Sequence, residues 1–273
     1  MKSRFLLILL LSYSVYISAQ TLHNGIRLPE QWPPRYPEPQ VPTEMQVPYL
    51  YEKPDVISIN TGRQLFVDDF LISETTLSPV YHTPTYYEGN PVLEPDKLWE
   101  KTIDGAPYAA PFSDGIWYDE KEKKFRMWYL AGAGSIYKED KMAFYTCYAE
   151  SEDGKIWTKK NQDIVAGTNI VDTCNRDAST IWLSREDPSK RWKSFNIQPL
   201  NDKRNWQVVL KYSADGIHWS KGVAQSGDLG DRTTAFYNPF TKKWVLSMRG
   251  STNISRRSRF YLEHEDPEML VSL

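Results

Sequence analysis

The sequence predicts an all-β protein, a β-propeller built from four-stranded blades with about three blades present. Aromatic residues make up 14 % of the chain, and aromatic side chains favour strands. From residue 65 onward, short runs of β-branched and aromatic residues alternate with clusters of Gly, Asn, Asp and Pro, which is the pattern of strands and turns. Two sequence patterns also recur at intervals of 54 to 65 residues, and four-stranded sheets repeated at such a period are typical of propeller blades.

Composition excludes some function classes. The formal net charge is −2 and the sequence pI is about 6.1, so the chain lacks the basic excess that a nucleic-acid partner requires. Hydrophobic residues make up 40 % and charged residues 25 %, which is enough apolar material for a packed core. We therefore expect a folded domain that does not bind nucleic acid.

The first residues have the features of a secretory signal peptide. Lys2 and Arg4 precede an apolar run over residues 5–11, and small and polar residues follow up to Ala19. The alternative, a membrane anchor, requires a longer apolar run to span about 30 Å of hydrocarbon. We predict a signal peptide over residues 1–19, cleavage before Gln20, and a secreted or periplasmic protein without membrane contact after cleavage.

A proline-rich segment follows the predicted signal peptide. Residues 28–54 contain eight of the 18 prolines. Proline lacks an N–H donor and fixes φ, so this segment is neither helix nor sheet interior. We predict an extended leader over residues 20–59 that acts as a linker, and a partial propeller domain over residues 60–273.

The first recurring pattern is a strand, a turn and an aromatic-rich strand. It occurs at residues 115–129, 179–195 and 234–248, with Trp117, Trp182 and Phe236 at equivalent places. Each copy has a charged or Asn-Pro turn between its two strands. We interpret each copy as the hairpin formed by the first two strands of a blade.

The second recurring pattern is Ser-x-Asp-Gly-x-x-Trp, at residues 151–157 and 213–219. Asp-Gly favours a tight turn, because glycine tolerates positive φ. We predict a structural turn between the outer strands of one blade, with the Trp packed inward; a Trp that stacks on a sugar is the alternative.

Together the two patterns define three blades. They run from about Asp104 to Lys159, from Arg176 to Lys221, and from Asp231 to about Glu265. Propellers close with about four to eight blades, and an unclosed ring leaves apolar surface and strand edges in water. We therefore expect a truncated gene product, with closure by oligomerisation as the alternative and a monomer as the state of a full-length protein.

The sequence contains no recognisable metal or cofactor site. The four histidines are scattered without the spacing of zinc ligands. Cys147 and Cys174 either pair or remain buried thiols. We predict no metal, no cofactor and no helix after the signal peptide.

Acidic residues stand just before the predicted innermost strands, which converge on the axis of a propeller. Asp177 lies five residues before Trp182, and Asp231 lies five residues before Phe236. The equivalent position in the first blade is Phe112.

The first blade offers Asp114 or Asp104 in place of an acid at the Phe112 position. Arg176 and Arg232 adjoin the acids of the other two blades, and an arginine beside a buried carboxylate orients it and keeps it ionised. The alternative is that these aspartates only cap turns and strands. For the pair Asp68 and Asp69, a bend or bulge at a strand is the favoured interpretation.

One of these elements resembles a known family. Arg176-Asp177-Ala178 is similar to the Arg-Asp-Pro element of the five-bladed propeller glycoside hydrolases of families 32, 43 and 68. Residues 115–129 resemble their blade pattern, and residues 90–93 with Trp99-Glu100 resemble their entry segment. Residues 111–115 and Asp231-Arg232 stand where that family carries Asn-Asp-Pro-Asn-Gly and Glu-Cys.

The resemblance implies roles for the acids, because glycoside hydrolysis uses two carboxylates on either side of the scissile bond. It implies that Asp177 supports the sugar ring or tunes the acid, that Asp231 is the general acid, and that Asp104 or Asp114 is the base or nucleophile. The substrate-binding candidates are Arg176, Arg232, Tyr108 and Trp128.

Three functions follow from this resemblance. The first is a secreted glycoside hydrolase-like protein that cleaves glycosidic bonds in poly- or oligosaccharides. The second is a propeller that binds carbohydrate without catalysis, and the third is an inactive fragment of such an enzyme. In the first two, the partner is a carbohydrate.

Overall fold

The computed structural model describes residues 20–32, 53–63, 65–101, 106–132, 144–200, 205–252 and 257–273. The predicted signal peptide and Asp104 lie outside these residues. The chain divides into two compact units, residues 1–79 and residues 80–273. The described structure is all-β with antiparallel sheets and almost no helix, which confirms the predicted fold class at that level.

The first unit contains turns and extended chain in its described residues. A turn around Gly25, at φ +84°, brings Thr21 and Arg27 together in a single β-bridge. Asp68 Oδ1 accepts a hydrogen bond from the Phe70 backbone N–H at 3.0 Å, which confirms the bend predicted at this acidic pair. The expectation of strands from residue 65 was wrong, because the first described strand begins at Ala109.

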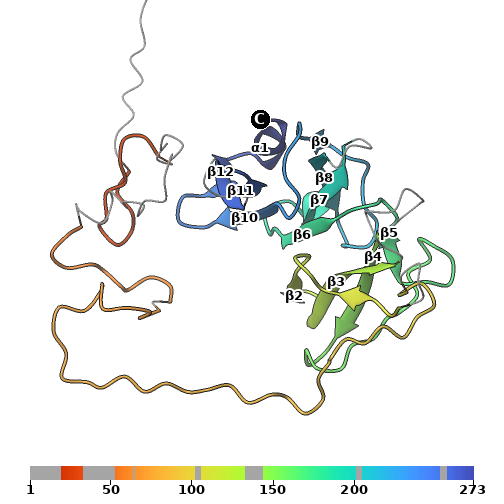
Figure 1. Cartoon of the computed structure of the whole chain (residues 1–273), viewed down its shortest axis with the longest axis horizontal. Coiled ribbons are helices and arrows are strands. Elements are labelled where there is room, and N and C mark those ends of the chain that lie inside the picture. Colours follow the sequence, from red (N-terminus) through yellow and green to blue (C-terminus); the bar gives the residue numbers. More distant parts are fainter. Residues whose placement is uncertain are drawn as a thin grey trace, which may run out of the picture. The chain divides into compact units, whose positions relative to one another are not determined.

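The first sheet of the second unit contains β1 (Ala109–Ala110), β2 (Ile116–Asp119), β3 (Lys124–Gly132), β4 (Phe144–Ser151) and β5 (Ile170–Asp172). Both β1 and β2 pair with β3, and β4 and β5 follow in order (Figure 1). The hairpin predicted at residues 115–129 is thereby confirmed. The sheet extends past the predicted end at Lys159, since its last strand is β5.

The second sheet has the order β6 (Ala178–Leu183), β7 (Trp192–Pro199), β8 (Trp206–Ser213) and β9 (Ala224–Gln225). Each strand pairs with the next one along the chain. A 3-10 helix over Pro188–Lys190 lies in the turn between β6 and β7. The sequence predicted this hairpin.

The third sheet has the order β10 (Thr234–Asn238), β11 (Lys243–Gly250) and β12 (Ser258–His264). The helix α1 (Pro267–Ser272) follows, capped by Asp266, which accepts hydrogen bonds from the backbone N–H groups of residues 268 and 269. Leu270 and Val271 of α1 are buried in the core shared with the second sheet. The expectation of no helix was wrong here. None of the described helices is long and apolar enough to cross a membrane.

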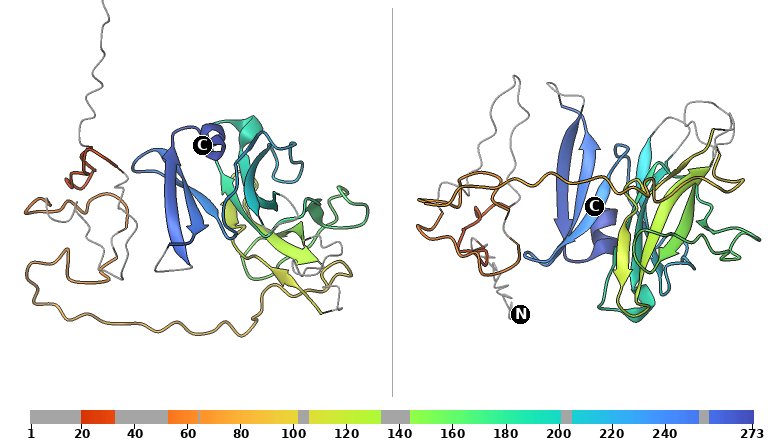
Figure 2. Two further views of the ribbon diagram at one scale, coloured as in Figure 1. Left: turned by 45° about the horizontal axis from the view of Figure 1, so that its top comes forward. Right: turned by 90° about the horizontal axis from the view of Figure 1, so that it is seen from below.

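The three sheets pack face to face in the order of the sequence (Figures 1 and 2). Trp128 of the first sheet packs against Trp192 of the second, with ring centroids 4.6 Å apart and the ring planes tilted by 54°. Trp182 of the second sheet meets Trp244 of the third edge-on at 5.9 Å. Such aromatic pairs contribute about 0.5–1.5 kcal/mol each beyond the burial of their area. The many aromatic side chains of the sequence therefore stabilise the packing between the sheets.

Arg126 of β3 ties the first sheet to the second. Its Nε donates to the Tyr148 hydroxyl at 2.8 Å, its Nη1 lies 3.3 Å from Asp119 Oδ2, and its Nη2 donates to the Asp215 carbonyl. Its guanidinium also lies 4.9 Å from the centre of the Trp192 ring. A buried cation is tolerated because each of these contacts compensates part of its lost hydration.

The two Ser-x-Asp-Gly-x-x-Trp repeats form the predicted turns, the first after β4 and the second after β8. In the second copy, Ser213 Oγ accepts from Gly216 N at 2.8 Å, and Asp215 Oδ1 accepts from the N–H groups of Ile217 and His218 at 2.8 Å. The first copy repeats this network with Ser151 and Asp153. The motif therefore supplies acceptors for the N–H groups of a tight turn.

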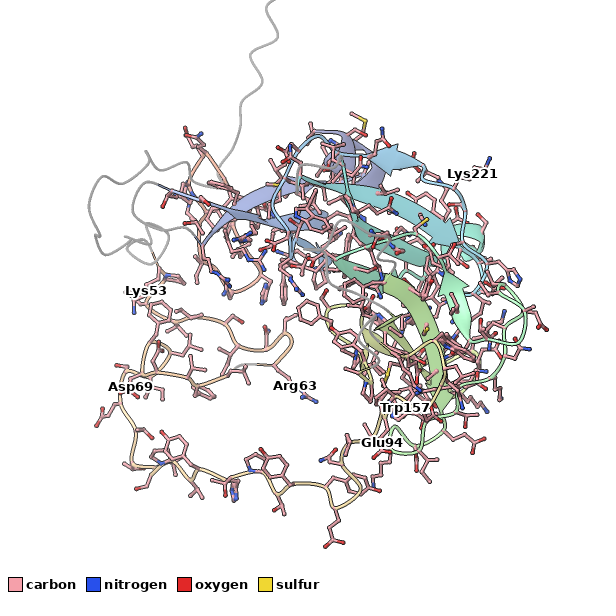
Figure 3. The ribbon with its side chains drawn as sticks, turned by 45° about the vertical axis from the view of Figure 1, so that its right-hand side comes forward. Lys53, Arg63, Asp69, Glu94, Trp157 and Lys221 are labelled. Carbon is pink, nitrogen blue, oxygen red and sulfur yellow. The ribbon has the colours of Figure 1, made fainter. Side chains whose placement is uncertain are left out.

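The tryptophans that end the two repeats pack inward, as predicted. Trp157 is partly buried against an apolar cluster of the first sheet (Figure 3), and Trp219 against the layer between the first and second sheets. The two cysteines are both free thiols, with Cys147 buried and Cys174 half-buried. Cys174 Sγ lies 3.1 Å from Lys211 Nζ.

Candidate active site

Strand β2 of the first sheet, β6 of the second and β10 of the third lie side by side and run in the same direction. Ser113 Oγ donates to the Ser179 carbonyl at 2.8 Å, and Trp117 Nε1 donates to the Ile181 carbonyl at 2.7 Å. From the first contact to the second, the residue number increases on both sheets. Neighbouring strands behave in this way only when they are parallel, so β2 and β6 are parallel neighbours.

The same relation holds between the second and third sheets. The Arg232 N–H donates to Asp177 Oδ2 at 3.2 Å, and the Ala235 N–H donates to Thr180 Oγ1 at 3.3 Å. Both contacts join residues 55 positions apart in the sequence. Side chains that precede β2, β6 and β10 therefore lie at one common end.

Asp177 is held in one orientation by Arg232. Its Oδ2 accepts the Arg232 backbone N–H and lies 3.3 Å from Arg232 Nε, while Oδ1 accepts no hydrogen bond from the described part of the chain. The side chain is 3 % exposed. Burial raises the pKa of Asp177, which the Arg232 charge lowers and the Asp231 charge raises further. The carboxyl group therefore has one fixed oxygen, one oxygen without a partner, and an increased affinity for a proton.

Arg232 adopts a backbone conformation that non-glycine residues rarely use. Its φ is +56°, in the left-handed region that costs a side-chain-bearing residue about 1 kcal/mol or more. In this conformation the backbone N–H and the side-chain Nε both reach the same Asp177 oxygen. The guanidinium also lies 4.2 Å from the centre of the Phe112 ring, at the position that the sequence aligned with Asp177 and Asp231.

Behind Asp177, Asp114 and Arg176 form a buried ion pair. Both side chains are 0 % exposed, and Arg176 Nη2 lies 2.9 Å from Asp114 Oδ1. Arg176 Nε donates to Thr146 Oγ1 at 2.7 Å. Burial raises the pKa of Asp114 to about 6, although Arg176 opposes the change. Since neither side chain reaches the surface, the predicted contact of Arg176 with substrate is wrong, and Asp114 is inaccessible as a nucleophile.

Asp231 lies at the edge of a hollow of about 400 Å³ between the second and third sheets. Its carboxylate pairs with Arg249, and its side chain is 25 % exposed. The lining combines polar groups with apolar ones: Asp228, Asp231, Arg249, Trp206, Met248 and Phe260. Carbohydrates bind to sites of this mixed character, because sugars have both hydroxyl groups and apolar faces.

The remaining residues that the sequence predicted for the site lie elsewhere in the structure or outside its described part. Trp128 is 0 % exposed and donates from Nε1 to the Gly216 carbonyl at 2.8 Å, so its predicted stacking on a sugar is wrong. Tyr108 is half-buried, with its ring 5.8 Å from that of Phe144. Asp104 lies outside the described residues. Sequence reasoning missed Arg249, which follows the last residue of the third hairpin pattern.

The described residues contain no group of three or more His, Cys, Asp or Glu side chains able to hold a metal ion. The carboxylates of this end instead have arginine partners, in the pairs Asp114–Arg176, Asp177–Arg232 and Asp231–Arg249.

Comparison with protein families gave no match, and neither did comparison with curated proteins. Among solved structures, the chain is similar to the crystal structure of an N-acetylgalactosamine deacetylase from F. plautii in complex with blood group B trisaccharide. The TM-score is 0.47 at 14 % sequence identity. The match covers 66 % of this chain and 55 % of the deacetylase, so this chain spans about half the length of that relative.

Proposed function

We propose that the three sheets are blades of a β-propeller of the five-bladed type, and that the common end of β2, β6 and β10 is a carbohydrate-cleaving site. The fold proposal is supported by the sequential pairing within β2–β5, β6–β9 and β10–β12, by the face-to-face packing of the sheets and by the parallel strands β2, β6 and β10. In a propeller, such strands surround the axis and the residues before them line the entrance. We further propose that residues 1–19 direct secretion.

The observation that carries the functional proposal is the meeting of Asp177 and Asp231 at this end, in different environments. Burial raises the pKa of Asp177, while Asp231 is partly exposed on the hollow and paired with Arg249. Glycoside hydrolysis needs one carboxyl that carries a proton and one that is ionised. The buried Asp177 and the arginine-paired Asp231 supply two carboxyl groups in different environments, which supports this proposal.

The environments favour a division of roles other than that implied by the family resemblance. Asp177 is the general acid: its proton passes to the glycosidic oxygen as the bond to the anomeric carbon breaks. Asp231, whose carboxylate pairs with Arg249, is the partner that either attacks the anomeric carbon or takes a proton from the attacking water. Asp114 and Arg176 are positioning residues, because both are enclosed behind the site.

A non-catalytic carbohydrate-binding propeller is the second candidate. Asp177 is only 3 % exposed, and the hollow has the aromatic and apolar lining of Trp206, Met248 and Phe260. This function needs the hollow and the arginines, but it does not need a carboxyl that holds a proton.

Turnover by the variant Asp177→Asn separates the two functions. The protein is tested against a panel of aryl glycosides and polysaccharides, with oligosaccharide binding measured on the same samples. A glycosidase loses at least about 10²-fold in turnover, the lower range for a general acid, and keeps its binding and its unfolding temperature.

The matched control is Asp163→Asn. Asp163 is exposed and has φ +57°, a conformation that Asn accepts, so turnover stays unchanged in this variant. A wild-type protein that binds oligosaccharide without cleaving any member of the panel supports the binding module and contradicts the glycosidase.

A further inference from the structure

Three arginines gather at one end of the third sheet, next to the proposed site. Arg232 precedes β10, Arg249 lies near the end of β11, and Arg259 lies near the start of β12. Arg249 and Arg259 are direct partners across the two strands. Like charges in such a pair destabilise a sheet. A nearby negative charge or a bound anion would offset this repulsion.

Two of the three guanidinium groups have a carboxylate partner. Arg232 pairs with Asp177, and Arg249 pairs with Asp231. Asp228 also lines the hollow, but it forms no ion pair with these arginines in the described structure. Arg259 likewise has no carboxylate partner among the described residues, where its contacts are with neutral carbonyl groups.

Those carbonyl contacts orient the Arg259 guanidinium. Its Nη1 donates to the Arg232 carbonyl at 2.8 Å and to the Ser247 carbonyl at 3.0 Å. A guanidinium has five donors in a planar fork. With Nη1 occupied twice, the Nε–H and Nη2–H groups remain without an acceptor in the described part of the chain, and Arg259 is exposed. These two donors form the edge that binds a carboxylate or a sulfate through two parallel hydrogen bonds.

We propose that Arg259 binds an anionic group of the carbohydrate ligand, so that the substrate class is an acidic glycan carrying a carboxylate or a sulfate. This inference rests on the proposed function, because it assigns a substrate class to the same site. Arg232 contributes a second positive charge: its carbonyl holds Arg259, and its own side chain is 44 % exposed.

Affinity for matched acidic and neutral sugars tests the proposal. Calorimetric titration of the whole chain compares a trigalacturonic acid with its methyl ester, which removes the charge and adds one methyl group per carboxyl, and a sulfated disaccharide with its unsulfated form. We expect at least one acidic ligand to bind tenfold or more tightly than its neutral counterpart at low salt. Preference for only the carboxylate or only the sulfate identifies the anion and supports the proposal.

Variants connect the preference to Arg259. Arg259→Gln removes the tenfold preference, and Arg259→Lys retains only part of it, because an ammonium keeps the charge but lacks the two-donor edge. The control Arg185→Gln makes the same change in charge beyond the opposite end of β6, where Arg185 pairs with Glu120 in an exposed contact; it keeps the full preference. The unfolding temperature of each variant verifies folding, and Arg259→Lys provides the test if Arg259→Gln does not fold.

Several results overturn the proposal. Equal affinity for the acidic and neutral forms contradicts the anion site while leaving the proposed function intact. Equal losses in Arg259→Gln and Arg185→Gln indicate only general charge attraction. Inorganic sulfate that binds as tightly as the sulfated sugar indicates a site for free ions. If no oligosaccharide binds, the inference and the proposed function are both wrong.

Discussion

Asp114 allows a sharp test of the buried pair behind the proposed site. Its carboxyl group is completely buried beside Arg176, and burial raises its pKa from 3.8 to about 6. The folded protein therefore binds this proton more tightly than the unfolded chain does. Between these two pKa values, the free energy of unfolding falls as pH rises.

The size of the effect follows from the two pKa values. One pKa unit corresponds to about 1.36 kcal/mol. A rise from 3.8 to about 6 therefore lowers the stability of the folded state by about 3 kcal/mol once Asp114 is ionised. The substitution Asp114→Asn keeps the shape and removes the titration. As the pH rises from 3 to 7.5, we expect the free energy of unfolding of the variant to increase by about 3 kcal/mol relative to that of the wild type.

Urea unfolding at several pH values measures this difference. The control is Asp153→Asn in the first turn repeat, where hydrogen bonds from the Ile156 and Lys155 backbones lower the pKa of the exposed carboxyl. The stabilisation by Asp153 is present above pH 3.8 and is lost as pH falls, so its variant changes in the opposite direction. A difference between Asp114→Asn and wild type that stays constant from pH 3 to pH 7.5 would refute the reasoning.

Three further predictions concern the turns and the core. Asp215→Ala lowers the free energy of unfolding at pH 7 by about 1 kcal/mol, as expected for a lost cap. The loss is larger than in Asp153→Ala, because only the turn that contains Asp215 also binds Arg126. The pKa of Asp215 is lowered to about 2, so the loss shrinks as pH falls from 3.8 toward 2; chemical unfolding at pH 7 and pH 2.5 measures it. Trp128→Phe costs about 1–3 kcal/mol in thermal unfolding, because the buried Gly216 carbonyl loses its donor. Iodoacetamide at pH 8 modifies Cys174 first, since Cys147 is buried and its pKa is raised to about 12; equal rates by mass spectrometry would contradict the packing of the first sheet.

The hairpins could be predicted because their determinants are local. Alternation of aromatic and polar residues, with turn residues at the right spacing, defined the pairs β2–β3, β6–β7 and β10–β11 from sequence alone. The Asp-Gly turns were predictable for the same reason, since Ser213 and Asp215 satisfy N–H groups within three residues of themselves. The helix α1 was missed because six residues are too few to display a helical period.

The site could be predicted only in part. The positions of Asp177 and Asp231 could be predicted because each precedes the first strand of its sheet. Arg259 depends on its cross-strand register with Arg249, which no local pattern reveals. Trp128 was misassigned because β3 is buried on both faces, so an aromatic side chain there is enclosed whichever way it points.

The proposed catalytic partnership of Asp177 and Asp231 is tested most directly by a double-mutant cycle on turnover. Residues that act as a unit have strongly non-additive effects. We expect Asp177→Asn and Asp231→Asn each to reduce kcat by at least about 10²-fold, and the double variant to lose little more than the worse single variant. Undiminished kcat in either single variant, or losses that simply multiply in the double variant, would contradict the assignment.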